Sequence, residues 1–479
     1  MTPIIYIRGY AGTSSAVESA VDSPYYGFND GSSRIRVDGR GKPAMHLFES
    51  PLIRLMREYG FHDVFVHVRN GKVEVLKSNP DAAFKQESIW IFRYYEETSE
   101  TLGSGRRKKI EELADDLAVL VDFVRTRTGA AKVDLVSHSM GGLVARSLIQ
   151  RKWKKTAADK IRRLFTYGTP HRGIHFRGGL GWAEWVRDVA GVNDSDTFGQ
   201  KRMRQFLNLP DATEDLNQLG RGTNFSPDQC FSLIGTNHHD YELTVSRNAV
   251  GPGSDGLVMC EHAYIKGSNR AYVHRAHSGP YGLVNSEEGY QNLQRFLFGD
   301  TAVKIALLGV TVNTAQLRAS RGAGLECILI ESKANIRNVG GYIHYQQKEF
   351  GSHLSVKPGE LKAGETLFRI FLMKSKRSDS NDSWSRFHIE IALRPLFKRV
   401  LNLGEYEGDV LFRKTLEIGV SDPHPDGSRD VVWSWDSLNQ TELKTIRLPK
   451  ATGIHQIDLP SHASALTGGR LEFEVSEWG

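Results

Sequence analysis

The feature that most limits what this chain can fold into is the alternation of short apolar runs with longer helical patterns over its first 300 residues. Residues 108–126 show the helical pattern most clearly, because apolar side chains recur there at spacings of three and four and so form one stripe. Strands that alternate with helices favour a parallel sheet with helices packed against it. The predicted strands are Pro3–Ile7, Asp63–His67, Ile89–Phe92, Val133–Val136, Leu164–Tyr167 and Cys230–Ile234.

A different pattern follows a predicted helix at Glu288–Phe298. From residue 301 onward, short runs alternate apolar and polar residues, and turn-forming segments such as Pro425-Asp426-Gly427 separate them. We therefore expect an α/β domain over residues 1–300 and an all-β, sandwich-like domain over residues 301–479, which suits a chain of 479 residues. The strands predicted in the second domain are Val303–Val310, Cys327–Glu331, Gly341–Tyr345, Leu367–Met373, Phe387–Leu393, Lys414–Ile418, Asp430–Trp435 and Leu471–Val475.

Residues 173–228 interrupt the first domain with sequence rich in Gly, Trp and Asn. We expect an insertion above the sheet, whose apolar side chains include Trp182, Trp185 and Phe206. A mobile lid over an apolar acyl channel and a small helical cap share this composition. The sequence leaves both interpretations open.

The composition excludes several other classes of protein. The chain is 39% hydrophobic and 25% charged, as globular proteins are, and its net charge of +6 is not gathered into the dense basic runs typical of nucleic-acid binding. Cys230, Cys260 and Cys327 are too widely spaced to predict a disulfide framework or a zinc cluster. No apolar run is long enough to cross a membrane, and no secretory signal is recognisable. We therefore expect no nucleic-acid partner and no transmembrane segment, and either a cytoplasmic protein or one exported without a cleaved signal.

The strongest local motif is a serine between a predicted strand and a predicted helix, in Val133-Asp134-Leu135-Val136-Ser137-His138-Ser139-Met140-Gly141-Gly142. A nucleophile elbow places its serine on such a turn and needs small residues on both sides, because helix and strand approach closely there. Gly141 meets this need, whereas Ser137 stands where the G-x-S-x-G pattern has its first glycine. Ser139 is therefore the candidate nucleophile, and the alternative is an ordinary helix N-cap.

A serine nucleophile needs a histidine base and a carboxylate that orients the base. In the order typical of this arrangement, Asp255 follows in the loop Gly253–Val258, and His277 lies 22 residues further on, in a loop before the last helix of the domain. We predict Asp255 as the acid and His277 as the base. The alternatives are Asp240 for the acid and His274 for the base.

Backbone N–H groups must stabilise the negative charge that acyl transfer places on the carbonyl oxygen. Met140 directly follows the serine and begins the helix, so its N–H is one predicted donor. The second is predicted in the loop after the first strand, Arg8-Gly9-Tyr10-Ala11-Gly12, where glycines allow the backbone to approach a ligand. Tyr10 is the candidate there.

These blocks together resemble the α/β-hydrolase superfamily, and within it the bacterial lipases and esterases. Four blocks over residues 1–300 occur in the family's order: Arg8–Gly12, the Ser139 elbow, Gly168-Thr169-Pro170-His171-Arg172-Gly173, and Asp255–Val258 before His277. The resemblance implies an α/β-hydrolase fold, a triad of Ser139, Asp255 and His277, and oxyanion donors at Tyr10 and Met140. Arg8 replaces the family's histidine, and Ser137 its first glycine.

Other residues have a functional and a structural interpretation. His171 and the pair His238-His239 are either metal ligands or isolated surface histidines, and surface histidines are the more common case. Arg8 and Arg172 would bind an anionic head group or, more commonly, form ion pairs. We claim no metal site and expect no cofactor.

The sequence predicts a serine carboxylic ester hydrolase that acts on a small-molecule or lipid ester with an apolar acyl group. A phospholipase or an acyltransferase would use the same triad. A protein of another class would bind carbohydrate, lipid or polymer through its β domain, with Trp433 and Trp435 as an exposed aromatic face, against the alternative that both pack inward.

Overall fold

The computed structural model describes the chain in two compact units. The described residues are those of 1–479 except 12–13, 38–40, 70, 77–82, 175–198, 212–213, 242–246, 248–249, 318–322, 358, 361–363, 378, 380, 400–403, 437–442, 451–452 and 461–464. One unit comprises residues 1–270 and 274–290, and the other comprises residues 271–273 and 291–479. No helix in the described ranges is both long enough and apolar enough to cross a membrane.

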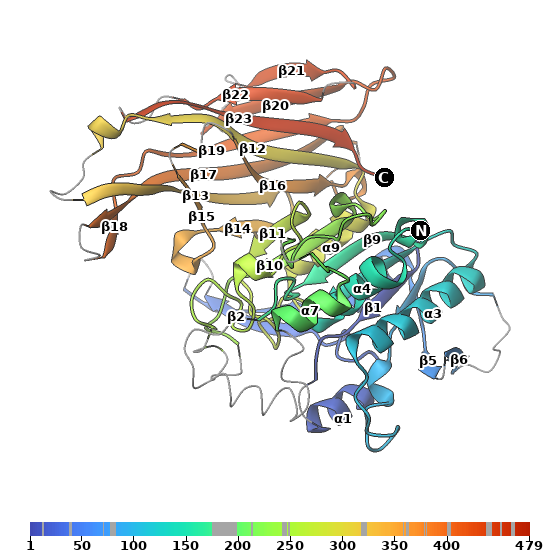
Figure 1. Cartoon of the computed structure of the whole chain (residues 1–479). Coiled ribbons are helices and arrows are strands. Elements are labelled where there is room, and N and C mark those ends of the chain that lie inside the picture. The colour runs from blue at the N-terminus through green and yellow to red at the C-terminus, as the bar shows by residue number, and fades with distance from the viewer. Residues whose placement is uncertain are drawn as a thin grey trace. The chain divides into compact units, whose positions relative to one another are not determined.

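The first unit is built on a parallel sheet with helices packed against it (Figure 1). The strand order is β11-β10-β9-β8-β1-β7-β4, and the five pairings from β10 to β4 are all parallel. The sheet strands are β1 (Ile4–Ile7), β4 (His62–Val64), β7 (Ser88–Ile91), β8 (Val133–His138), β9 (Ile161–Tyr167), β10 (Cys230–Gly235) and β11 (Asn269–Val273). The helices are α1 (Ser14–Asp22), α2 (Pro51–Tyr59), α3 (Ile110–Thr128), α4 (Met140–Ser147), α5 (Ala157–Lys160) and α7 (Gln200–Phe206). Helix α9 (Glu287–Phe298) begins in this unit, and its residues from Gln291 onward belong to the second unit, as do Ala271–Val273 of β11.

Helix α3 shows how local sequence sets these elements. Glu112 accepts a hydrogen bond from the N–H of Lys109 at 2.8 Å and so caps the first turn. Gly129 ends the helix with φ 67°, a left-handed conformation that glycine adopts without strain. The buried side chains of α3, among them Leu113, Leu117 and Val121, form the stripe that the spacing predicts.

Two hairpins in this unit differ from the sequence prediction. The single strand predicted at Asp63–His67 is divided between β4 and β5 (Val66–Arg69), and β5 pairs with β6 (Lys72–Val75) outside the main sheet. A second hairpin, β2 (Ser32–Val37) with β3 (Pro43–Phe48), was not predicted. Both hairpins carry alternating polar residues. Whether such a segment forms a strand depends more on its pairing partner in the fold than on its local sequence pattern.

Part of the predicted insertion at residues 173–228 is anchored to the unit by a buried arginine. Arg146 of α4 is fully buried, and its guanidinium donates to the carbonyl oxygens of His171 (2.9 Å), Leu216 (2.9 Å) and Gln218 (2.7 Å). Phe206 of α7 is also fully buried. The described part of the insertion therefore packs against the unit, whereas Trp182 and Trp185 lie outside the described residues.

The second unit consists of antiparallel sheets, as the sequence predicts. One sheet has the order β16-β12-β23-β22, and the other has the order β14-β13-β17-β19-β20-β21, with β15 beside β13 and β18 beside β17. Side chains from both sheets share one core cluster, which is the arrangement of a β-sandwich. The strands are β12 (Thr301–Val312), β13 (Ala323–Ile336), β14 (His344–Gln346), β15 (Leu354–Val356), β16 (Glu365–Leu372), β17 (Trp384–Arg399), β18 (Glu405–Glu407), β19 (Phe412–Ser421), β20 (Arg429–Trp435), β21 (Lys444–Leu448), β22 (Ile454–Asp458) and β23 (Leu466–Glu477).

The sandwich core contains Trp433, so the inward-packing alternative is confirmed for this residue and the exposed aromatic face is excluded. Trp433 is 8% exposed and packs against His455 and Phe473. Trp435 is partly buried against the same core and meets Phe412 edge to face. Residues two apart in a strand share a face, and on β20 that face is the inner one.

Candidate active site

Ser139 lies on the turn between β8 and α4 in a strained backbone conformation. Its φ of 51° and ψ of −126° are outside the regions that L residues ordinarily occupy. The turn is held by two hydrogen bonds, from the Ser139 N–H to the Tyr167 carbonyl (2.9 Å) and from Thr169 Oγ1 to the Ser139 carbonyl (2.8 Å). The Ser139 side chain makes no capping hydrogen bond to α4, so the N-cap alternative is wrong.

Glycines allow the segments around Ser139 to approach one another. A Cβ at Gly9 would lie 2.7 Å from the Cβ of Ser139, and a Cβ at Gly141 would lie 2.4 Å from the Ile7 carbonyl oxygen. Neither position has room for a side chain. Ser137, which replaces the first glycine of the pattern, is fully buried in β8 between the paired residues Ile7 and Thr166. The strand therefore accommodates a serine at that position.

The structure brings Ser139, His277 and Asp255 together in one hydrogen-bonded series. His277 Nε2 lies 3.0 Å from Ser139 Oγ, and His277 Nδ1 lies 2.8 Å from Asp255 Oδ2. Asp255 Oδ1 accepts the backbone N–H groups of Leu257 (3.0 Å) and Val258 (2.7 Å), which fix the carboxylate. The three side chains are at most 6% exposed. Such a series can move the serine proton to the imidazole while the carboxylate stabilises the positive charge.

The alternative acid and base lie elsewhere. His274 follows β11, and its Nδ1 lies 3.3 Å from Thr236 Oγ1. Asp240 is exposed and accepts a hydrogen bond from Asn237 Nδ2 at 2.6 Å. The hydrogen bonds of Ser139 and His277 instead connect these two residues to each other and to Asp255.

The segment Gly168–His171 packs against the series Ser139–His277–Asp255. A Cβ at Gly168, where φ is 52°, would lie 2.9 Å from Asp255 Oδ2 and 3.1 Å from His277 Nδ1. Next in the chain, Thr169 binds the Ser139 carbonyl. This segment therefore contacts all three members of the series through two adjacent residues.

His138 is a neighbour of the site that the sequence analysis did not single out. Its Nε2 lies 2.9 Å from the carbonyl oxygen of His277, and the two rings are 4.9 Å apart. Burial, together with the positive charge of a protonated His277, lowers the pKa of His138 to about 3. A carbonyl oxygen only accepts, so neutral His138 carries its proton on Nε2 and donates it. The signal in the sequence was its position directly before the serine.

His171 is not a surface histidine, contrary to the more common interpretation. It is fully buried, and its Nε2 lies 3.1 Å from Thr166 Oγ1. Burial lowers its pKa well below the usual value, and the nearby charge of Arg146 acts in the same direction.

Acid should destabilise this unit through His138 and His171. Unfolding restores a histidine pKa near 6.5, so below that pH the unfolded chain takes up protons that the folded chain does not. The free energy of unfolding should therefore fall as the pH falls below 6.5, by at most about 1.4 kcal/mol per pH unit for each histidine, and for His138 this fall should continue to about pH 3. Urea unfolding curves at pH 7, 6 and 5 would measure this slope. The variant His171→Gln should have a shallower slope than the wild type, and an equal slope would contradict this role of His171.

The predicted oxyanion donors, Met140 and Tyr10, belong to segments that adjoin the serine. Met140 is the first residue of α4, where no preceding turn of the helix supplies a carbonyl acceptor for its N–H. Tyr10 follows Gly9, whose backbone abuts Ser139. Tyr95 Oη donates to the Gly9 carbonyl (2.8 Å) and accepts the N–H of Ala11 (2.6 Å), so one hydroxyl bridges the residues on both sides of Tyr10.

Both arginines that were considered for binding an anionic head group make contacts within the structure. Arg8 donates to the Tyr26 carbonyl, and Arg172 lies 3.9 Å from a carboxylate oxygen of Asp215.

Within the part of the chain that the structure describes, no group of three or more His, Cys, Asp or Glu side chains is placed to hold a metal ion. The rings of His238 and His239 lie 3.9 Å apart and are tilted by 39°.

Comparisons with known proteins add relatives for part of the chain. A family model described as the PGAP1-like alpha/beta domain matches residues 94–177, which include Ser139. Triacylglycerol lipases of Pseudarthrobacter phenanthrenivorans and Burkholderia plantarii are 37% identical over 75 residues, or 16% of this chain. The match spans only 20% and 18% of those lipases.

Solved structures with some likeness share little sequence with the chain. A gene product of Listeria innocua is 16% identical, with a TM-score of 0.33 over 62% of this chain and 94% of its own. The naproxen esterase of Bacillus subtilis is 10% identical, with a TM-score of 0.24 over 62% of this chain and 83% of its own.

Proposed function

We propose that this chain, which is related to the α/β-hydrolase superfamily through its PGAP1-like segment and its lipase matches, is a serine carboxylic ester hydrolase. The relation agrees with the predicted fold, a parallel sheet with helices followed by an all-β region. The observation that carries the proposal is the series Ser139–His277–Asp255, with distances of 3.0 and 2.8 Å. The lipase matches favour a lipid ester as substrate.

The reaction would proceed through an acyl-enzyme. Ser139 Oγ attacks the ester carbonyl carbon while His277 Nε2 takes its proton, and the N–H groups of Met140 and Tyr10 stabilise the negative oxygen. The C–O bond to the alcohol then breaks, and His277 gives the alcohol its proton. Water, deprotonated by His277, attacks the acyl-enzyme next, and the carboxylic acid leaves as Ser139 regains its proton.

Hydrolysis of p-nitrophenyl esters from acetate to palmitate would test this function. Serine-dependent activity that rises with chain length indicates a lipase with an open acyl channel, and a short-chain optimum indicates an esterase. A fluorophosphonate probe, which reacts with activated serines, should label the protein at Ser139 whatever the preferred ester. Absence of both labelling and ester hydrolysis would refute the proposal. Release of lysophospholipid, or acyl transfer to an added alcohol, would identify a phospholipase or an acyltransferase.

Tyr95 should affect catalysis without touching the substrate. Replacing it by phenylalanine removes the hydroxyl that bridges Gly9 and Ala11, so the Tyr10 N–H is held less precisely. A lost oxyanion donor costs about 10²–10³ in kcat, and we expect Tyr95→Phe to lose roughly 10- to 100-fold in kcat with KM little changed. Steady-state kinetics would separate the effect on kcat from the effect on KM. The affinity for an alkyl boronic acid should fall by a factor similar to the loss in kcat.

The matched control is Tyr6→Phe. Tyr6 is also fully buried, and its hydroxyl has no hydrogen-bond partner among the described residues, so its removal should leave kcat unchanged. Equal kcat in Tyr95→Phe and wild type would contradict the role of the bridge. A raised KM with kcat unchanged would contradict it as well.

A further inference from the structure

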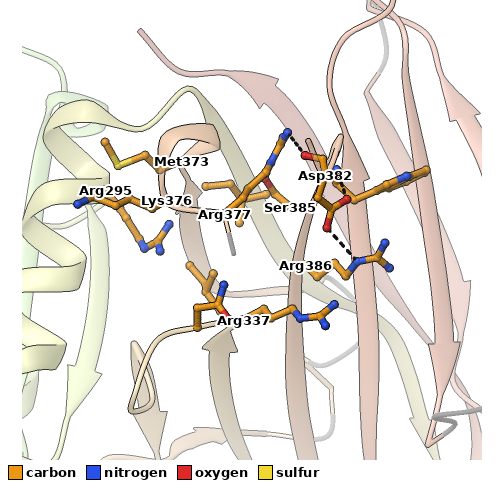
Figure 2. Close-up of a pocket in the computed structure, with 12 residues that line it drawn as sticks. Arg295, Arg337, Met373, Lys376, Arg377, Asp382, Ser385 and Arg386 are labelled. Atoms are coloured by element: carbon orange, nitrogen blue, oxygen red, sulfur yellow. Dashed lines mark hydrogen bonds and ion pairs between the residues drawn. The ribbon is translucent and has the colours of Figure 1, made fainter. Parts of the chain in front are cut away.

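A side chain that donates to a main-chain carbonyl can hold two segments of this protein together. In the second unit, Arg377 donates to the Asp382 carbonyl at 2.8 Å and to Ser385 Oγ at 2.9 Å (Figure 2). It also binds the Asp422 carboxylate at 2.8 Å, and its side chain is only 6% exposed. These bonds join the segment after β16 to the start of β17 and to the residue that follows β19, so the role of Arg377 is structural.

His138 makes the same kind of contact at the candidate active site. Its ring donates from Nε2 to the His277 carbonyl oxygen, 2.9 Å away. The ring also abuts the loop of the predicted oxyanion donor Tyr10, because a Cβ at Gly9 would lie 3.0 Å from His138 Nδ1. His138 therefore contacts both the loop that carries the base and the loop that carries an oxyanion donor.

The main chain of His277 is held from two sides. Its N–H donates to the Asp255 carbonyl at 2.9 Å, and its carbonyl accepts the hydrogen bond from His138. The ring of His277 meets the Asp255 carboxylate at Nδ1 and Ser139 Oγ at Nε2. The adjacent residues His138 and Ser139 thus contact the base residue at two points, its carbonyl and its ring.

The loop that carries His277 also has hydrogen bonds of its own. The Ala276 N–H donates to the Tyr281 carbonyl at 3.0 Å, and the Leu283 N–H donates to the Ala276 carbonyl at 2.9 Å. These bonds fix the shape of the loop, and the bond from His138 ties the loop to the turn that bears the serine. Proton transfer needs the base within hydrogen-bond reach of the serine, and a misplacement of about 1 Å costs roughly 10²-fold in rate.

A neutral donor suits this position, because His277 becomes positively charged when it takes the serine proton. The rings of His138 and His277 are 4.9 Å apart. Burial lowers the pKa of His138 to about 3, and the charges of a protonated His277 and of Arg8 act in the same direction. His138 therefore supplies a hydrogen bond without a second positive charge, which would oppose protonation of the base.

We propose that His138 is a positioning residue, which holds the His277 carbonyl so that His277 Nε2 stays aligned with Ser139 Oγ. This role rests on the proposed ester hydrolysis, because the aligned atoms are those that exchange the proton. His138 orients the base and does not bind the substrate, so its hydrogen bond acts on kcat with little effect on KM.

Three substitutions of His138 separate the donor from the rest of the side chain. Glutamine has an amide nitrogen as many bonds from Cα as Nε2 of histidine, methionine has the same length without a donor, and asparagine has its amide one bond closer to Cα. We expect His138→Met and His138→Asn to lose roughly 10- to 100-fold in kcat with KM little changed, and His138→Gln to stay within about threefold of wild type. Steady-state kinetics on the preferred p-nitrophenyl ester would measure this, and circular dichroism would establish that each variant folds. If His138→Met does not fold, His138→Asn against His138→Gln makes the same comparison.

Arg377→Met shows what the loss of a structural donor alone should do. It removes the bonds to Asp382 and Ser385, so the urea midpoint should fall while kcat stays unchanged. The same result in His138→Met would overturn the positioning role. A raised KM with kcat unchanged, or equal losses in His138→Met and His138→Gln, would overturn it as well.

Magnetic resonance of the full chain, labelled with ¹⁵N histidine, tests the donor without a substrate. The ring signals that His138→Gln removes should be those of a neutral imidazole with its proton on Nε2, unchanged from pH 8 to pH 5. A proton on Nδ1 instead, or a charged ring at pH 5, would overturn the proposal. A wild type that neither hydrolyses esters nor reacts with the fluorophosphonate would refute the proposed function, whereas an active wild type with an equally active His138→Met would refute the positioning role alone.

Discussion

Replacing Ser139 by alanine should lower ester hydrolysis by roughly 10⁴- to 10⁶-fold, the loss found when a triad nucleophile is removed. Alanine fits the turn, because the backbone hydrogen bonds to Tyr167 and Thr169 do not use the serine hydroxyl. Residual activity would come from substrate binding and the oxyanion donors alone. Initial rates on the preferred p-nitrophenyl ester, with fluorophosphonate labelling beside them, would measure the loss.

Ser137→Ala is the matched control for this variant. Ser137 is a fully buried serine two residues earlier on the same strand, and its removal should leave both rate and labelling close to wild type. Unchanged activity in Ser139→Ala, with the fold intact by circular dichroism, would eliminate Ser139 as the nucleophile.

Replacing Asp255 by asparagine should lower kcat by about 10⁴-fold, as loss of the triad carboxylate does elsewhere. Asparagine keeps an oxygen for the N–H groups of Leu257 and Val258, so the loop should remain in place. The amide nitrogen would then donate to His277 Nδ1, which forces the ring proton onto Nε2. In that tautomer Nε2 faces Ser139 as a donor and cannot take the serine proton.

Asp240→Asn tests the alternative acid. Asp240 is bound to Asn237 at the surface and should tolerate the change with activity within about twofold of wild type. Similar losses in both variants would indicate a general effect on the loop rather than a specific role for Asp255. A loss confined to Asp240→Asn would reverse the assignment.

The sequence predicted the parallel sheet, and it singled out three residues that the structure joins by hydrogen bonds, because both inferences depend on local signals. The turn from β8 through Ser139 to α4 is formed by residues that are adjacent in the sequence, so a short motif predicts it. Asp255 and His277 lie in loops that follow strands, and the carboxyl ends of parallel strands meet at one edge of a sheet. The interpretation of His171 as a surface residue was wrong because it depended on exposure, which short segments do not specify. Tyr95 was missed because its contacts with Gly9 and Ala11 join segments far apart in the chain.

The separation of Ser139 from His277 has a consequence for the newly made protein. Their hydrogen bond joins residues 138 positions apart, and contacts of long range form late in folding. A chain emerging from the ribosome carries its serine long before its histidine exists, so that hydroxyl stays an ordinary alcohol during most of translation. A fragment that ends before residue 255 would likewise keep the serine turn without acid or base. Reactivity of the serine towards a fluorophosphonate would thus report that the first unit has folded far enough to join Ser139 to His277, in a nascent chain as well as in a purified one.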